Sequence, residues 1–146
     1  MTIDVAEEHR MIIDLVEKFV DNELMPLERA VMEREASGEP VSLIKEEEVT
    51  LLAKCKELGL WALDAPEPLG GAELPTTVML AIQERLRRTV TPFIFPPDSP
   101  NLHMLMDVAT SEQKEKYLRP YAQGEMKSCI AISELGAGGD PAQMKT

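Results

Sequence analysis

The sequence contains few of the side chains that usually build disulfides, metal sites and catalytic centres. Among its 146 residues there are two cysteines and two histidines. Cys55 and Cys129 have no further Cys or His at a metal-ligand spacing, which argues against a disulfide scaffold and a zinc site, so we expect two buried thiols. His9 and His103 are interpreted as surface or structural residues, and no arrangement of acids, bases and nucleophiles indicates a catalytic centre.

Long apolar runs and basic residues are also scarce. No apolar run is long enough to cross a bilayer, and the first eight residues resemble neither a signal nor a transit peptide, so we expect a cytoplasmic protein. The net charge of −11 at pH 7 argues against a nucleic-acid or anionic-membrane partner. The one basic cluster of note, Arg85, Arg87 and Arg88, is interpreted as a solvated helix face.

What the sequence does contain is helical periodicity, which predicts an all-α domain of about five helices in an orthogonal or up-down bundle. The first helix is expected over residues 5–36, with a kink between Asn22 and Pro26, because proline removes a backbone donor and crowds the preceding turn. A second helix is expected over residues 49–58, preceded by the acidic run 46–48 and capped by Gly59. A third begins at Pro75 and Thr76 and ends near Leu86, and a fourth covers residues 102–109. The fifth runs from a capping box at 110–113 to about Ala122 and is followed by Gly124.

The end of the chain has a different pattern. Residues 127–132 are expected to form a strand, which has no pairing partner in the preceding sequence. The next residues carry three glycines within four positions, 136–139, followed by Asp140 and Pro141. From the residues alone, a backbone cradle for phosphate and an ordinary glycine-rich turn between domains have equal weight. The context does not fit a Rossmann fingerprint, since the preceding sequence is helical.

In this order, the segments resemble the N-terminal helical domain of the acyl-CoA dehydrogenase family. The resemblance extends from the acidic first helix through residues 58–61 and 66–71 to 112–118. It is strongest in the tail, where the family pattern A-[LIVM]-[ST]-E-P-x-A-G-S-D is similar to residues 131–140. Leu135 stands in place of the proline and Gly139 in place of the serine.

The resemblance implies an FAD-dependent oxidoreductase of fatty acid metabolism that desaturates an acyl-CoA thioester between its α and β carbons. It implies that the backbone around Ile130 and Ile132 and the hydroxyl of Ser133 face the isoalloxazine edge of the flavin. Gly138 and Gly139 would face the pyrophosphate. It also implies an acyl-CoA substrate, an electron-transfer flavoprotein or similar acceptor, and a homotetramer for the full-length protein.

By resemblance, the β domain and the catalytic glutamate of the family come later in the chain. We therefore expect residues 1–126 to form the helical domain, residues 127–146 to lead toward an absent β domain, and the chain to be inactive alone, with no catalytic residue of its own. The alternative hypothesis is a stand-alone, flavin-less helical protein derived from that family, which binds a partner. The segment from Phe93 to Met106 is expected to contribute to an acyl pocket, with Phe95 as the test position.

Overall fold

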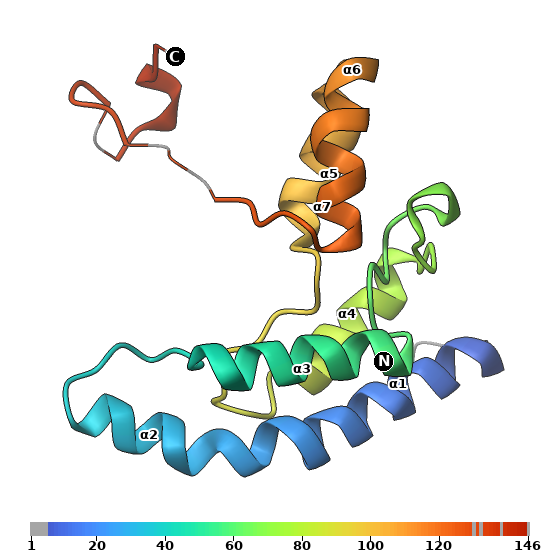
Figure 1. The fold of residues 1–146 in the computed structure, drawn as a ribbon, viewed down its shortest axis with the longest axis vertical. Coiled ribbons are helices and arrows are strands. Elements are labelled where there is room, and N and C mark those ends of the chain that lie inside the picture. Colours follow the sequence, from blue (N-terminus) through green and yellow to red (C-terminus); the bar gives the residue numbers. More distant parts are fainter. Residues whose placement is uncertain (1–5, 130, 132, 138, 146) are drawn as a thin grey trace.

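The computed structural model of the chain describes residues 6–129, 131, 133–137 and 139–145. Within these residues the regular structure is entirely helical. Irregular turns join α1 to α2 and α6 to α7, so the chain forms five helical segments (Figure 1), as the sequence predicts. Their bounds are α1 Glu7–Phe19, α2 Glu28–Ala36, α3 Lys45–Leu58, α4 Thr76–Leu86, α5 Ser99–Val108, α6 Ser111–Gln113 and α7 Arg119–Gln123.

α1 and α2 form one bent helical rod, with two irregular turns between them (Figure 1). A π turn covers Val20–Leu24 and a 3-10 turn covers Met25–Leu27. Pro26 has no N–H and its ring crowds the turn before it, so the regular α-helical hydrogen-bond pattern stops here. The kink predicted between Asn22 and Pro26 is confirmed.

The bend offers a backbone carbonyl to a distant segment. The N–H of Glu28 donates to the oxygen of Met25. The oxygen of Leu24 accepts a hydrogen bond of 2.8 Å from the buried hydroxyl of Thr91. The carboxylate of Glu28 accepts a second one, also 2.8 Å long, from the hydroxyl of Thr89. The segment that follows α4 is therefore tied to the bend.

The larger of two hydrophobic cores lies among α1, α3, α4 and the segment after α4. Three phenylalanines meet in it. The ring of Phe19 lies 5.5 Å from that of Phe93 and 5.6 Å from that of Phe95, and these two rings are 5.5 Å apart, edge to face. Edge-to-face and tilted pairs at this distance add to the stabilisation that burial provides. The other buried members include Val16, Val20, Leu24, Leu51, Cys55, Leu60, Val78, Ile82 and Leu86.

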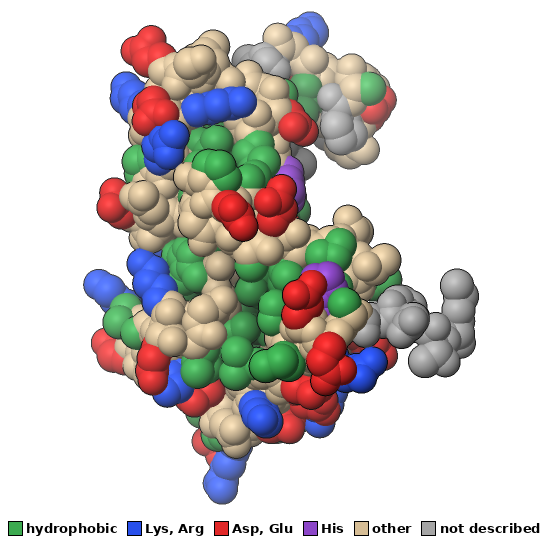
Figure 2. Space-filling model, turned by 90° about the vertical axis from the view of Figure 1, so that its right-hand side faces the viewer, with side chains coloured by type: hydrophobic (Ala, Val, Ile, Leu, Met, Phe, Trp, Pro, Cys, Tyr) green, Lys and Arg blue, Asp and Glu red, His purple; other side chains and the backbone are tan. Residues whose placement is uncertain are grey.

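A smaller core joins α5 and α7, which stand side by side beyond the first rod in Figure 1. Trp61 is partly buried and packs against both cores. Its Nε1 donates a hydrogen bond of 2.7 Å to the oxygen of Ala122 at the end of α7. Trp61 thus connects the two cores. Figure 2 shows hydrophobic side chains gathered at the waist between the two parts of the molecule.

The basic cluster of α4 is not simply a solvated face. Arg88 lies 2.8 Å from a carboxylate oxygen of Glu17 and 3.2 Å from one of Asp21. Arg85 lies 3.5 Å from the other oxygen of Glu17. These arginines pair with α1 because α1 and α4 pack together, a contact that helical periodicity alone does not reveal. Arg87 is exposed, as expected.

The two cysteines lie in opposite environments. Cys55 is fully buried, and burial raises the pKa of its thiol to about 12, because the charged thiolate is poorly solvated there. Cys129 is exposed. The prediction of two buried thiols is correct for Cys55 and wrong for Cys129, which lies in the tail beyond the last helix.

Candidate functional site

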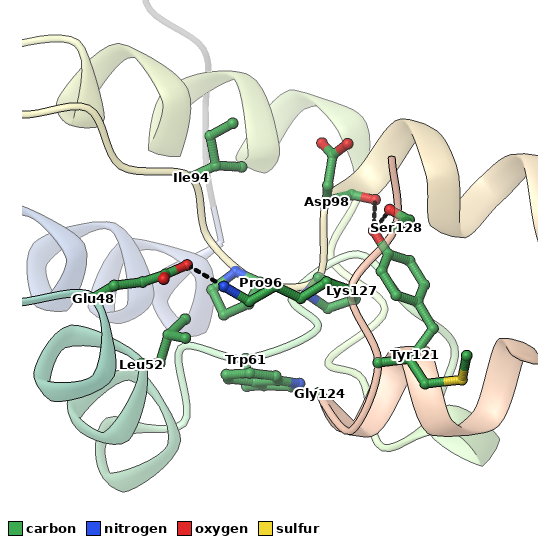
Figure 3. Close-up of a pocket in the computed structure, with 12 residues that line it drawn as sticks. Glu48, Leu52, Trp61, Ile94, Pro96, Asp98, Tyr121, Gly124, Lys127 and Ser128 are labelled. Atoms are coloured by element: carbon green, nitrogen blue, oxygen red, sulfur yellow. Dashed lines mark hydrogen bonds and ion pairs between the residues drawn. The ribbon is translucent and has the colours of Figure 1, made fainter. Parts of the chain in front are cut away.

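A cavity of about 230 Å³ opens where the tail leaves the helices. Figure 3 shows Leu52 and Trp61 on one side of it and Tyr121 on the other, with Ile94 beyond. Ligand pockets of small molecules are usually lined in this way, by apolar and aromatic side chains with a few polar groups. Proline and methionine side chains complete the apolar lining, and Glu48, Asp98, Lys127 and Ser128 supply the polar groups.

The segment before α5 divides its side chains between the cavity and the core. Ile94, Pro96 and Asp98 line the cavity. Phe93 and Phe95 lie in the phenylalanine cluster of the larger core instead. Phe95, the test position of the sequence analysis, thus lies in the core and not in the cavity lining, and the contribution of this segment to an acyl pocket stays a prediction.

Two contacts hold the first residues of the tail against this cavity. The ammonium of Lys127 lies 2.7 Å from a carboxylate oxygen of Glu48 on α3. On the other side, the amide nitrogen of Asn101 donates hydrogen bonds of 2.9 Å to the hydroxyl of Ser128 and 3.1 Å to the carboxylate of Asp98. Ser128 donates to the hydroxyl of Tyr121 at 3.0 Å, and Tyr121 donates to the backbone oxygen of Asp98 at 3.1 Å. The tail thus has contacts to both parts of the molecule.

The strand expected over residues 127–132 is not formed by the residues described there, 127–129 and 131. An extended segment becomes a strand only when its backbone N–H and C=O groups pair with a neighbour. In the structure this segment runs away from the helices (Figure 1). Local sequence therefore favoured an extended conformation that has no neighbouring strand among the described residues.

The candidate flavin contacts of the tail divide into two groups. Ile130, Ile132 and Gly138 lie outside the described residues. Ser133 and Gly139 are both exposed. Gly139 has a φ of 79°, and a Cβ placed on it would meet nothing within 4 Å, so its backbone is open to a ligand. The left-handed conformation gives a physical reason for glycine at this position in place of serine.

A compact turn follows these residues. The carboxylate of Asp140 accepts hydrogen bonds from the N–H of Ala142 at 3.1 Å and from the side-chain amide of Gln143 at 2.9 Å. Both bonds favour the ionised form, with the Gln143 bond first, and they lower the pKa of Asp140. Asp140 thus caps the 3-10 turn Pro141–Gln143. The Asp140 carboxylate therefore bonds to other residues of the tail, Ala142 and Gln143.

Groups with catalytic chemistry are sparse in the described part of the chain. No cluster there of three or more His, Cys, Asp or Glu side chains could hold a metal ion. His103 has its Nε2 2.9 Å from a carboxylate oxygen of Asp64, and the pair ties α5 to the loop after α3. The structural role expected for His103 fits this contact. That the chain contributes no catalytic residue stays a prediction.

Comparison with known proteins identifies the helical unit. Residues 6–125 match the family described as "Acyl-CoA dehydrogenase, N-terminal domain". The chain belongs to the acyl-CoA dehydrogenase family. Its relatives include (R)-benzylsuccinyl-CoA dehydrogenase of Thauera aromatica, which is 32% identical over 154 residues covering 100% of this chain. Another is the mitochondrial short-chain specific acyl-CoA dehydrogenase of Rattus norvegicus, 28% identical over 99% of this chain.

A solved structure supports the same assignment. A putative acyl-CoA dehydrogenase from Mycobacterium abscessus superposes with a TM-score of 0.77 at 29% identity, covering 98% of this chain and 38% of that one. The chain likewise spans 38% of the Thauera relative and 34% of the rat relative. The resemblance of this family member to the N-terminal helical domain is therefore confirmed, whereas the boundary at residue 126 stays a prediction.

The lengths and composition of the helices bear on whether the chain can span a membrane. None of those in the described residues is both long and apolar enough to cross a bilayer. The cytoplasmic location inferred from the sequence stays a prediction.

Proposed function

We propose that this chain is the N-terminal domain of an FAD-dependent acyl-CoA dehydrogenase that desaturates an acyl-CoA thioester between its α and β carbons. The observation that carries the proposal is the family match over residues 6–125, followed directly by an exposed glycine-rich tail that starts at an apolar cavity. Acyl-CoA dehydrogenases generally use FAD. The proposed role of the chain is to supply one side of the cofactor and substrate site.

The tail residues fit a flavin in the chemistry of their donors. Ser133 presents an exposed hydroxyl, which can donate to or accept from a polar ring edge. Gly139 presents an open backbone, which suits close approach of a phosphate. Ile130, Ile132 and Gly138 complete the proposed set. When bound, FAD would supply the acceptor for the hydride, and the protein would supply binding and orientation.

The cavity fits the acyl part of the substrate. Leu52, Trp61 and Ile94 offer apolar surface to a hydrocarbon chain, whose transfer from water is favourable by about 0.8 kcal/mol per buried CH₂ group. We also propose that the full-length protein passes its electrons to an electron-transfer flavoprotein or similar acceptor and assembles as a homotetramer. No residue of this chain is proposed as the catalytic base, so the chain alone is expected to show no turnover.

Flavin binding by the natural gene product tests the proposal. The purified protein should be yellow and should bind FAD in an absorbance titration, with affinity reduced by Ser133→Ala. Ser42→Ala, which also removes an exposed serine hydroxyl but lies far along the chain, is the control and should bind as wild type does. A protein that is colourless as purified and leaves the absorbance spectrum of added FAD unchanged contradicts the proposal.

Two further measurements separate this function from the alternative. Size-exclusion chromatography of the yellow protein should show a homo-oligomer. A colourless protein that elutes in a complex with a different protein would support the flavin-less partner-binding hypothesis instead. Turnover of an acyl-CoA by the 146-residue chain alone, with FAD and an artificial electron acceptor, would contradict its expected inactivity.

A further inference from the structure

The hydrogen bonds around Ser128 form a closed ring. Asn101 donates to Ser128, Ser128 to Tyr121, and Tyr121 to the backbone oxygen of Asp98, whose carboxylate accepts the second hydrogen bond of Asn101. Figure 3 shows the part of this ring made by Asp98, Tyr121 and Ser128. Asn101 donates in both directions around the ring, and Asp98 accepts at its carboxylate and at its backbone oxygen. Along the path from Asn101 through Ser128 and Tyr121 to Asp98, each hydroxyl accepts one hydrogen bond and donates the next, an arrangement in which hydrogen bonds strengthen one another. We call these four residues the polar ring.

The two helical members of the polar ring are buried. Asn101 and Tyr121 are each 6% exposed. Their polar atoms have little access to water, and a buried donor or acceptor without a partner is costly. The tail position that places the Ser128 hydroxyl between Asn101 and Tyr121 is therefore favoured, because it gives both side chains a hydrogen-bond partner.

Within the first residues of the tail, Ser128 alone can supply it. A serine hydroxyl accepts and donates at one atom, and the ring uses both functions. Lys127 donates only, and the thiol of Cys129 is weak in both roles. The side chain of Lys127 is directed to Glu48 on the other side of the segment. A slip of the tail by one residue would therefore leave the ring incomplete.

We propose that the polar ring sets the register in which the tail leaves the helices, and thereby positions Ser133 for the cofactor. The positioning part rests on the proposed function. Ser133 follows Ser128 by five positions, so the two residues lie at most about 18 Å apart, and an anchor at Ser128 limits where Ser133 can lie. A slip of one residue along an extended chain would move it by roughly 3.3 Å, more than a hydrogen bond tolerates. Asn101 and Tyr121 are thus positioning residues.

Cys129 provides a reporter of the register that needs no flavin. It is exposed and adjacent to Ser128, whereas the other cysteine, Cys55, is buried. A nitroxide attached to Cys129 of the 146-residue chain should give a broad, restricted electron paramagnetic resonance spectrum. Ser128→Ala should narrow the spectrum, and Ser128→Thr, which keeps a hydroxyl, should restore the restricted form. Ser42→Ala is the control and should leave the spectrum unchanged, with circular dichroism confirming the helical fold of each variant.

FAD affinity of the natural gene product gives the second readout. Ser128→Ala should weaken FAD binding about tenfold, the equivalent of one lost hydrogen bond, with Ser128→Thr near wild type. Tyr121→Phe should behave like Ser128→Ala, whereas Tyr117→Phe, the matched control on an exposed tyrosine, should not. The melting temperature of each variant separates lost positioning from lost folding.

The outcomes distinguish the register from the proposed function. A Ser128→Ala spectrum as restricted as that of wild type overturns the anchoring role, whatever flavin does. A narrowed spectrum with unchanged FAD affinity overturns the positioning role. A wild-type protein that binds no FAD overturns the proposed function, and the nitroxide spectra then still decide whether the polar ring sets the register.

Discussion

Gly124 lies where α7 ends, directly against Trp61. Its φ is 80°, and a Cβ placed on it would lie 2.4 Å from Cζ2 and 2.7 Å from Cη2 of the indole. The indole is held from other directions. Its Nε1 donates to the oxygen of Ala122 at 2.7 Å, and the ammonium of Lys56 lies 4.4 Å from the ring centroid. Gly124→Ala must therefore displace a ring that is already fixed.

The expected loss has two parts. A left-handed backbone costs a residue other than glycine about 1–2 kcal/mol. Displacing the indole costs its hydrogen bond to Ala122, and leaving a partly buried donor and acceptor unpaired costs about 1–3 kcal/mol more. Gly124→Ala should thus destabilise the protein by about 3 kcal/mol. Gly38→Ala provides the matched control, because Gly38 has a φ of 86° and nothing within 4 Å of a Cβ, so it should lose about 1 kcal/mol.

Urea unfolding of the 146-residue chain measures both losses. A second comparison uses the Trp61→Phe background, because phenylalanine lacks the two ring atoms that the new Cβ would meet. In that background Gly124→Ala should cost about as much as Gly38→Ala, roughly 2 kcal/mol less than in the wild type. Equal losses for Gly124→Ala and Gly38→Ala in the wild type, or the same Gly124→Ala loss in both backgrounds, would refute the reasoning.

Three further predictions concern the core, a helix start and pH. Phe95→Ala should cost about 3–5 kcal/mol in urea unfolding, because the ring is buried in the phenylalanine cluster and its removal leaves a cavity. Glu47→Ala should cost about 2 kcal/mol, because its carboxylate accepts two hydrogen bonds from Arg34 and one from the N–H of Ile44, the residue just before α3, whereas the exposed Glu46→Ala should stay within about 0.5 kcal/mol. The raised pKa of Cys55 predicts that the free energy of unfolding of the wild type falls relative to that of Cys55→Ala as pH rises from 9.0 toward about 12. In this window the unfolded state releases the thiol proton that the folded state keeps. Below it, the difference between the two proteins should not change with pH.

The helices could be predicted because their signals are local. Periodicity gave their number, and Gly59 and Gly124 adopt the left-handed caps expected of them. The capping box at Thr110 is present, with the Gln113 N–H bonded to the hydroxyl at 3.3 Å and the Thr110 N–H to the Gln113 side chain at 2.8 Å. α5 begins at Ser99, three residues before the predicted start at 102, because Pro100 lies in its first turn. Proline is well tolerated in the first turn of a helix, where its missing N–H is not needed.

The candidate site could be predicted only as a sequence pattern. The tail was singled out by its glycines and by its resemblance to a family motif. The cavity and the polar ring were not foreseen, because they depend on contacts between residues far apart in the chain. Asn101 and Ser128 are 27 positions apart, and Glu48 and Lys127 are 79 positions apart. Neither pair has a spacing that periodicity or a motif could detect. A serine between a lysine and a cysteine carried no signal.

The bend at Pro26 has a consequence for how this family member can vary in evolution. A regular helix would use the carbonyl of Leu24 internally, and the hydroxyl of Thr91 would then be buried without an acceptor. Conversely, an apolar residue at position 91 would remove the buried hydrogen bond that joins the segment after α4 to this carbonyl. Each single replacement is therefore costly, whereas the paired replacement is not. Among relatives, proline at position 26 and a hydroxyl at position 91 should be gained and lost together, although 65 positions separate them in the sequence.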